Sequence, residues 1–132
     1  MIVDTSAIMA LILDEPEAPA LRAALDGQSA AMSAATYVEL GAVVERRGPE
    51  GSGRRLDALL AEFGIDILPL TTRQAVLARS AYREYGRGSA HHAGLNLGDC
   101  FSYALAADRR EPLLFVGDDF ASTDLAPVLP TS

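Results

Sequence analysis

The sequence contains no lysine, only one cysteine and no long apolar stretch. Because Cys100 is alone, it cannot form an internal disulfide, which fits a reducing compartment and excludes a cysteine-rich zinc site. The longest unbroken apolar run, Ala7–Leu13, is far shorter than the roughly 18 residues that suggest a membrane span, and no basic segment precedes it as in a signal peptide. We therefore expect a cytoplasmic protein with no membrane partner.

Positive charge is also scarce, because 11 basic residues face 18 acidic ones and the net charge is −7. This balance argues against a nucleic-acid partner, since nucleic-acid-binding surfaces are normally basic. If four of the acids bind a metal, however, the rest of the protein is closer to neutral. Every basic side chain other than histidine is arginine, which suits bidentate contacts to phosphate. Genomic base composition explains an arginine-only, alanine-rich chain at least as well.

A chain of 132 residues with 49% hydrophobic content is expected to form one domain, residues 1–132, with a single core region. Short β-like runs alternate with amphipathic stretches, which predicts an α/β fold with a mostly parallel sheet of four to five strands. The predicted strands are 2–4, 30–33, 65–68 and 113–116, with a weaker edge strand near 128–129. The predicted helices are 6–13, 16–26, 34–47, 53–63, 72–85 and 97–109.

Acidic residues stand next to several of these segments. Asp4 and the pair Asp118-Asp119 follow predicted strands, whereas Glu39 and Asp99 lie in the first half of predicted helices. Each has an ordinary explanation as a helix cap, a first-turn acid, a solvated helical residue or a turn residue. Taken together, such positions converge at one end of a parallel sheet, which is where α/β proteins bind their ligands.

Four carboxylates in one cleft need a counter-charge, since two like charges about 4 Å apart repel by on the order of 4 kcal/mol at an effective dielectric near 20. Oxygen ligands without histidine or cysteine select Mg²⁺, with Mn²⁺ able to substitute. Such a metal can activate water and offset charge on a phosphoryl group. The acids therefore predict a metal-dependent reaction at phosphate.

The helix predicted at 72–85 and the residues just after it carry the candidates for RNA binding. Arg79, Arg83 and Arg87 follow one another at a spacing of four residues, with Tyr82 and Tyr85 between them. Arginines for phosphates and aromatic rings for unpaired bases are typical of single-stranded RNA recognition. The alternative is a solvated arginine face beside tyrosines that belong to the core.

Four motifs, IVDTSA, YVEL, GLNLGDCFSYALA and LLFVGDDF, occur in this order along nearly the whole chain. Together they resemble the PIN-domain ribonucleases, and among these the VapC-type toxins of type II toxin–antitoxin pairs. The resemblance implies a PIN-like three-layer α/β/α domain and a Mg²⁺-dependent endoribonuclease. It also implies cleavage of structured or single-stranded RNA (tRNA, rRNA or mRNA) to a 5′-phosphate and a 3′-hydroxyl. The implied partners are a cognate VapB-type antitoxin and a second copy of the chain in a homodimer.

Carried over by position, the resemblance makes Asp4, Glu39 and Asp99 three acids of the catalytic site, with Asp4 and Asp99 as metal ligands. Thr5 and Ser6 match the small hydroxyl residues that follow the first acid and support it.

The fourth acid departs from the family pattern, which is roughly T-x-D-x-D-F. Aligning Phe120 with the final phenylalanine puts Gly117 at the first acid position and Asp119 at the second. The resemblance therefore points to Asp119, with Asp118 as the alternative.

Two other functions remain as alternatives. A phosphatase that uses Asp4 as nucleophile is disfavoured, because no second aspartate follows two residues later and no lysine is present to hold a phosphoryl group. A catalytically weakened scaffold that binds RNA or protein is suggested by Gly117 at an acid position.

Overall fold

A small parallel sheet lies at the centre of the computed structural model, which describes residues 1–130 with four strands and six helices. The strands are Ile2–Val3 (β1), Ala30–Ser33 (β2), Ile65–Leu68 (β3) and Leu113–Leu114 (β4). The helices are Thr5–Ile12 (α1), Ala18–Leu25 (α2), Ala34–Arg47 (α3), Ser52–Glu62 (α4), Thr72–Tyr85 (α5) and Leu97–Arg109 (α6). Within this part of the chain, no helix is long and apolar enough to cross a membrane.

The order of the strands across the sheet is β3-β2-β1-β4, and all neighbouring strands are parallel. The chain first moves outward from β1 to β3 and then returns to the other side of β1 to form β4. The order therefore reverses between β1 and β4. In open parallel sheets, the crevice beyond the carboxyl ends of the strands at such a reversal is the usual ligand site.

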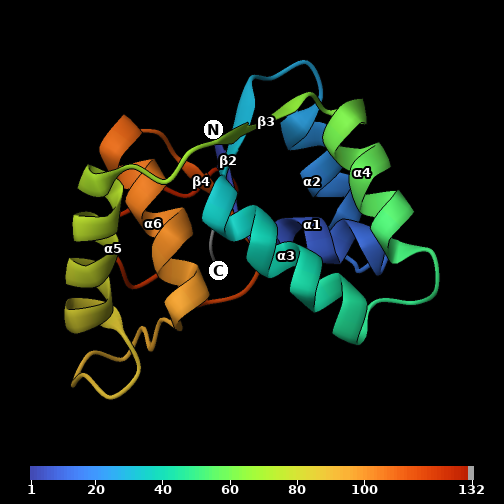
Figure 1. Cartoon of the computed structure of the whole chain (residues 1–132). Helices are drawn as coiled ribbons and strands as arrows, with labels where there is room; N and C mark the ends of the chain where they lie inside the picture. Colours follow the sequence, from blue (N-terminus) through green and yellow to red (C-terminus); the bar gives the residue numbers. More distant parts are fainter. Residues whose placement is uncertain (131–132) are drawn as a thin grey trace.

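Helices cover both faces of the sheet, which confirms the predicted three-layer α/β/α arrangement (Figure 1). Because side chains alternate along a strand, neighbouring residues of a strand pack against the helices on opposite faces of the sheet. Val3 and Leu114 pack with residues of α1, α2 and α4, whereas Ile2 and Leu113 pack with residues of α5 and α6. β1, β2 and β4 are thus buried on both sides, whereas the edge strand β3 is partly exposed. The polar residues that follow the strands emerge at the carboxyl edge of the sheet.

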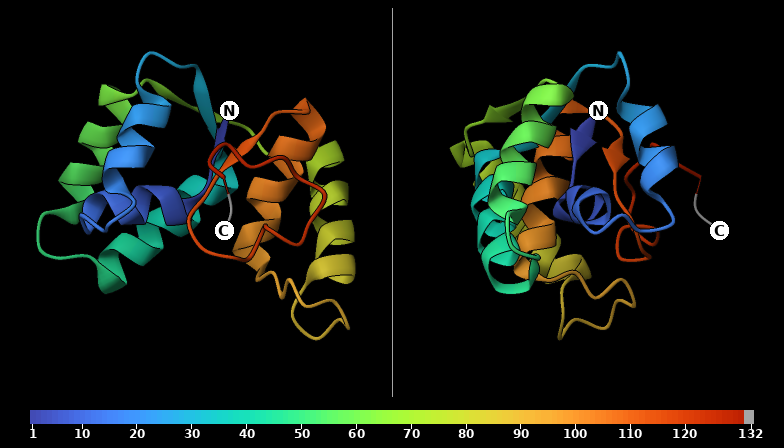
Figure 2. Two further views of the ribbon diagram at one scale, coloured as in Figure 1. Left: turned by 180° about the vertical axis from the view of Figure 1, so that it is seen from behind. Right: turned by 90° about the vertical axis from the view of Figure 1, so that its right-hand side faces the viewer.

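The segment after β4 crosses the back of the molecule over α6 and returns to β4 (Figure 2). The prediction of a fifth strand near 128–129 is wrong. Among the described residues of this segment, a single bridge forms, between Leu113 and Pro127, and the backbone N–H of Val128 donates to the carbonyl of Leu113 at 2.9 Å. Pro127 and Pro130 lack the N–H groups that a longer ladder would need.

Several element boundaries also differ from the prediction. Helices α1 and α4 each begin and end one residue earlier, and β1 ends at Val3. β4 ends at Leu114 because the N–H of Val116 donates to the hydroxyl of Ser6 at 3.0 Å rather than to a neighbouring strand. Helix α2 begins at Ala18, after a turn, because Pro19 and not Pro16 occupies the first helical turn.

Candidate active site

The four predicted acids come from four different parts of the fold and converge at the carboxyl edge of the sheet. Asp4 follows β1, Glu39 lies on α3, Asp99 lies on α6, and Asp119 lies in the segment after β4. Burial raises the pKa of Asp99, and the charges of the other three acids raise it further. Residues far apart in the sequence therefore form one electrostatic cluster, as the motif positions predict.

Asp4 is the most deeply buried of these acids, with 3% of its surface exposed. Its Oδ2 accepts hydrogen bonds from the N–H and the hydroxyl of Ser6, at 3.1 and 2.8 Å, and its Oδ1 accepts one from the hydroxyl of Ser102 at 2.5 Å. Asp4 is thus also the N-cap of α1. Burial raises the pKa of Asp4, while the hydrogen bonds from Ser102 and Ser6 act in the opposite direction.

Thr5 and Ser6 contact different acids. The Ser6 hydroxyl bonds to Asp4 and accepts from the N–H of Val116, so it links the ends of β1 and β4. The Thr5 hydroxyl instead donates to Glu39 Oε1 at 2.7 Å. The two hydroxyls that follow the first acid therefore hold two members of the cluster.

Glu39 lies half-buried on α3 and faces the first turn of α6. Its Oε2 occupies the space beside the backbone of Gly98, so that a Cβ atom at position 98 would overlap the carboxylate. Burial raises the pKa of Glu39, as does the charge of Asp4, whereas the Thr5 hydrogen bond and the charge of Arg46 lower it. Gly98 is therefore the residue that lets α3 and α6 bring their acids together.

Asp99 is the third residue of α6 and takes part in a capping box. Asn96 Oδ1 accepts from the N–H of Asp99 at 2.8 Å, and Asp99 Oδ2 accepts from the N–H of Asn96 at 2.9 Å. Burial, followed by the charges of the other acids, raises the pKa of Asp99 to about 7. Its capping role leaves Oδ1 without a hydrogen bond from any residue in the described part of the chain.

The two acids after β4 are both exposed but face different surroundings. Asp119 acts on Asp99 electrostatically, whereas Asp118 lines a separate hollow together with Glu17. This difference favours Asp119 over Asp118 as the fourth acid. Gly117, at the departing motif position, has a φ of +101°, which strains any residue with a side chain, so glycine has a conformational reason to be there.

The donor set fits a hard divalent cation in its chemistry, because every predicted ligand atom is a carboxylate oxygen. The absence of a side chain at Gly98 also lets the Glu39 carboxylate lie against the first turn of α6, which carries Asp99. Within residues 1–130, however, no three histidine, cysteine, aspartate or glutamate side chains already lie close enough together to form a metal-binding group. Mutual repulsion of the carboxylates is a sufficient physical reason for this spacing.

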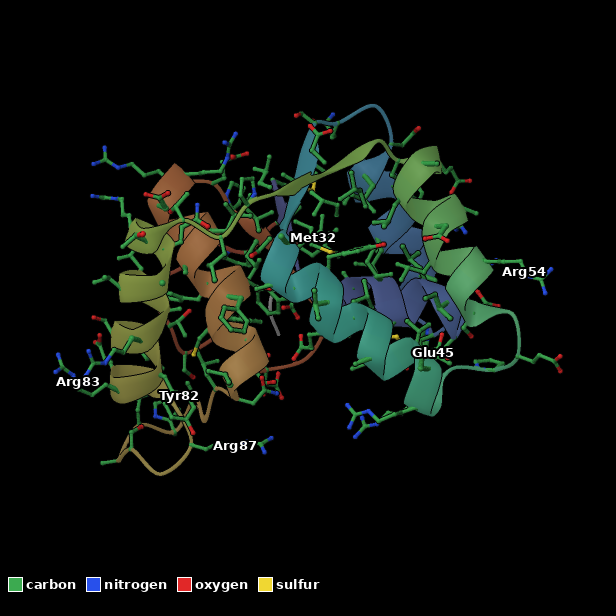
Figure 3. The ribbon with its side chains drawn as sticks, viewed as in Figure 1. Met32, Glu45, Arg54, Tyr82, Arg83 and Arg87 are labelled. Atoms are coloured by element: carbon green, nitrogen blue, oxygen red, sulfur yellow. The ribbon has the colours of Figure 1, made fainter. Side chains whose placement is uncertain are left out.

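The predicted RNA-binding arginines do not contact the acids. Arg79, Arg83 and Arg87 are exposed, and no ion pair in the described part of the chain joins them to the cluster. Figure 3 shows Arg83 pointing outward from α5 and Arg87 extending from the loop that leads to α6. Tyr82 is exposed, as RNA binding would need, whereas Tyr85 belongs to the core.

Sequence reasoning missed three residues of the site. Gly98 and Ser102 lie on α6 beside the motif aspartate, and Thr36 on α3 contacts Ser102. The spacing of three residues between Asp99 and Ser102 places them on the same side of a helix, and this signal was available in the sequence. No comparable signal pairs Gly98 with Glu39, because their contact depends on how α3 and α6 pack.

Comparison with known proteins identifies a family and relatives that match nearly the whole chain. The PIN domain family model matches residues 1–125. Ribonuclease VapC28 of Mycobacterium tuberculosis is 51% identical over 130 residues, which cover 98% of each chain.

Two solved structures share the fold. VapC20 of Mycobacterium tuberculosis, described as a sarcin-ricin loop cleaving toxin, superposes with a TM-score of 0.74 at 16% identity and covers 98% of both chains. A toxin–antitoxin complex from Klebsiella pneumoniae gives a TM-score of 0.69 at 22% identity, covering 93% of this chain and 92% of the other. At such low identities the likeness concerns the fold.

Proposed function

The chain belongs to the PIN-domain family and is a ribonuclease of the VapC type, and we propose that it cleaves RNA with Mg²⁺ held by Asp4 and Asp99. Glu39 and Asp119 complete the acidic cluster in this proposal. The observation that carries it is the convergence of acids from three other segments on Asp99, where burial, followed by the charges of these acids, raises the pKa. A bound cation would relieve this repulsion, which gives the cluster a physical reason to bind one.

The chain's own side chains have distinct tasks in this proposal. Asp4 is held on both of its oxygens and supplies a fixed anchor, while Asp99 offers the oxygen that its capping role leaves free. Glu39, with a raised pKa, is suited to accept a proton from the attacking water. When bound, Mg²⁺ or Mn²⁺ would supply positive charge at the phosphodiester and activate water.

The proposal includes partners. An RNA substrate follows from the ribonuclease assignment, and the likeness to a toxin–antitoxin complex supports a VapB-type antitoxin as protein partner. We propose that the protein acts in the cytoplasm as a homodimer.

Cleavage of total RNA tests the proposal directly. The native protein should cut RNA with Mg²⁺ or Mn²⁺ and stop when EDTA is added. Asp4→Asn and Asp99→Asn should each lower the rate by at least about 100-fold, because each removes a charged ligand of the cation. Asp57→Asn is the matched control, since Asp57 is an exposed acid on α4. Cleavage that persists in both site variants would contradict the assignment.

A binding module that has lost its activity is the second candidate, because one motif acid is replaced by Gly117. The positive φ of Gly117 weakens this alternative, since it explains the glycine without loss of the site. Titration calorimetry separates the two cases. A ribonuclease should bind Mn²⁺ in a manner that depends on Asp4, whereas an inactive scaffold should show no such binding.

A further inference from the structure

The hydroxyl of Ser102 lies deep in the molecule, against the predicted metal ligand Asp4. Ser102 is fully buried on α6, one turn after Asp99, and donates to Asp4 Oδ1 at 2.5 Å. One helix therefore supplies both an acid of the cluster and the hydroxyl that holds a second acid.

The direction of the hydrogen bonds extends this contact to α3. The hydroxyls of Ser102 and Thr36 are 3.3 Å apart, and both side chains are completely buried. A hydroxyl has one proton, and Ser102 uses its proton on Asp4, so Thr36 must be the donor in the second bond. A directed chain therefore runs from Thr36 through Ser102 to Asp4.

The other oxygen of Asp4 is held from the opposite side. Ser6 donates to Oδ2 with both its N–H and its hydroxyl, and the hydroxyl is itself oriented by the N–H of Val116. Hydrogen bonds from Ser6 on α1 thus hold Oδ2, with Val116 after β4 orienting the Ser6 hydroxyl, and a hydrogen bond from Ser102 on α6 holds Oδ1. Without Ser102, only the two hydrogen bonds from Ser6 would oppose rotation of the carboxylate about its bond to Cβ.

This restraint matters because the neighbouring charges oppose it. Glu39 and Asp99 lie near enough to Asp4 for their charges to interact, and ionised carboxylates repel one another. A carboxylate held at only one oxygen would turn away from its neighbours. Ligand orientation of this kind is normally secured by hydrogen bonds behind the metal ligands.

We propose that Ser102 is a positioning residue whose hydroxyl, oriented by Thr36, holds Asp4 in the orientation that binds the divalent cation. The inference rests on the proposed metal-dependent function and adds a specific residue to it. Ser102 contacts neither substrate nor metal in this arrangement and acts through Asp4.

Titration calorimetry with Mn²⁺, on the full chain, tests the role without relying on activity. Ser102→Ala should weaken Mn²⁺ binding by about 10- to 100-fold, the range typical for loss of a hydrogen bond behind a ligand. Leu105→Ala is the matched control, because Leu105 is buried on the same helix but has no polar group that could hold Asp4. It should lower the unfolding temperature in EDTA yet leave the Mn²⁺ affinity unchanged.

A second variant covers the case in which Ser102→Ala does not fold. Thr36→Val keeps the side-chain volume and removes only the outer donor, so Mn²⁺ binding should weaken several-fold and less than in Ser102→Ala. Native affinity in whichever of the two variants folds would overturn the inference while leaving the proposed function intact. Absence of Mn²⁺ binding by the native protein would instead overturn both.

Discussion

Gly98 determines how closely Glu39 approaches the start of α6, because the carboxylate fills the space where a Cβ atom would lie. Gly98→Ala should therefore displace Glu39 and lower RNA cleavage by on the order of 100-fold, the effect expected when a reacting group moves by about 1 Å. The added methyl group should cost little stability, because it meets only the far end of the flexible Glu39 side chain and because alanine is favoured over glycine within a helix. Cleavage assays and urea unfolding measure the two effects separately.

Gly41→Ala is the control for this substitution. Gly41 also lies in a helix, α3, but a Cβ atom there would meet nothing within 4 Å. The alanine should stabilise the protein by roughly 0.5–1 kcal/mol and leave cleavage unchanged. Equal activity of the two alanine variants would show that the contact between Gly98 and Glu39 is irrelevant to the reaction.

The raised pKa of Asp99 predicts an unusual dependence of stability on pH. Its pKa is about 7 in the folded protein against an ordinary value of 3.8. Between pH 3.8 and about 7, the folded protein therefore keeps a proton on Asp99 that the unfolded chain has lost. In EDTA, the contribution of Asp99 to folding should therefore be present at low pH and decline by a few kcal/mol as the pH rises toward 7. Urea unfolding at several pH values measures this slope.

Metal should reverse the slope, because Mn²⁺ binds the deprotonated carboxylate and its affinity rises with pH. Asp99→Asn supplies the comparison, since an amide does not titrate in this range. If the native protein and this variant show the same pH dependence in EDTA, the pKa of Asp99 is not raised as the structure indicates.

At the level of single residues, the sequence predicted the acids but not what holds them. Asp4, Glu39 and Asp99 stand in recognisable motifs, and in the folded chain their charges act on one another. Ser102 and Gly98 also lie within a motif, but their partners are on β1 and α3. Contacts between distant segments depend on packing, which local patterns do not encode.

Among the elements, the segment after β4 depends on a hydrogen bond to α6. Tyr103 donates to Asp124 Oδ1 at 2.6 Å, and burial, followed by the hydrogen bond and charge of Asp124, raises the pKa of Tyr103 so that it stays a donor. Tyr103→Phe should lower the free energy of unfolding by about 1 kcal/mol, since a charge-assisted bond is lost at a partly exposed site. Urea unfolding measures the change.

Tyr85→Phe is the matched control in the same cluster. The hydroxyl of Tyr85 also approaches Asp124 Oδ1, but at 3.5 Å, which is at the limit of a hydrogen bond. Its removal should cost less than the removal of the Tyr103 hydroxyl. The opposite order would mean that Tyr85, and not Tyr103, secures this segment.

The three longest helices and the strands β2 and β3 were predictable to the residue, whereas the bounds of the other elements were not. α3, α5 and α6 have the predicted bounds because each begins at a residue that caps it, namely Ser33, Thr71 and Asn96. β1 and β4 are shorter than predicted because tertiary hydrogen bonds at Asp4 and Val116 end them. Strand ends in a sheet are set by partners far along the chain.

Across the whole molecule, the net charge of −7 coexists with an exposed set of arginines, Arg79, Arg83 and Arg87, near the end of α5. If these bind RNA phosphates, replacing all three with alanine should weaken RNA binding. The slope of log affinity against log salt should fall by about 0.7 for each lost contact with single-stranded RNA. The Mn²⁺ affinity should not change, because none of the three is paired with the acids. Binding assays over a range of salt measure the slope.

Arg54→Ala provides the control for charge alone. Arg54 is exposed on α4, well separated from Arg83 in Figure 3. If its loss reduces RNA affinity as much as the loss of one arginine of the α5 set, then binding follows total charge and not a defined surface.

The pairing of β1 with β4 also bears on when the protein becomes active during its own synthesis. The first acid lies at residue 4, yet its supports come from Ser102 and, through Ser6, from Val116, which is 110 residues away from Ser6. Domains begin to fold from the N-terminus as they leave the ribosome, but contacts over such separations must wait for the later segment. A nascent chain therefore carries its acids in an unassembled state until translation has passed β4.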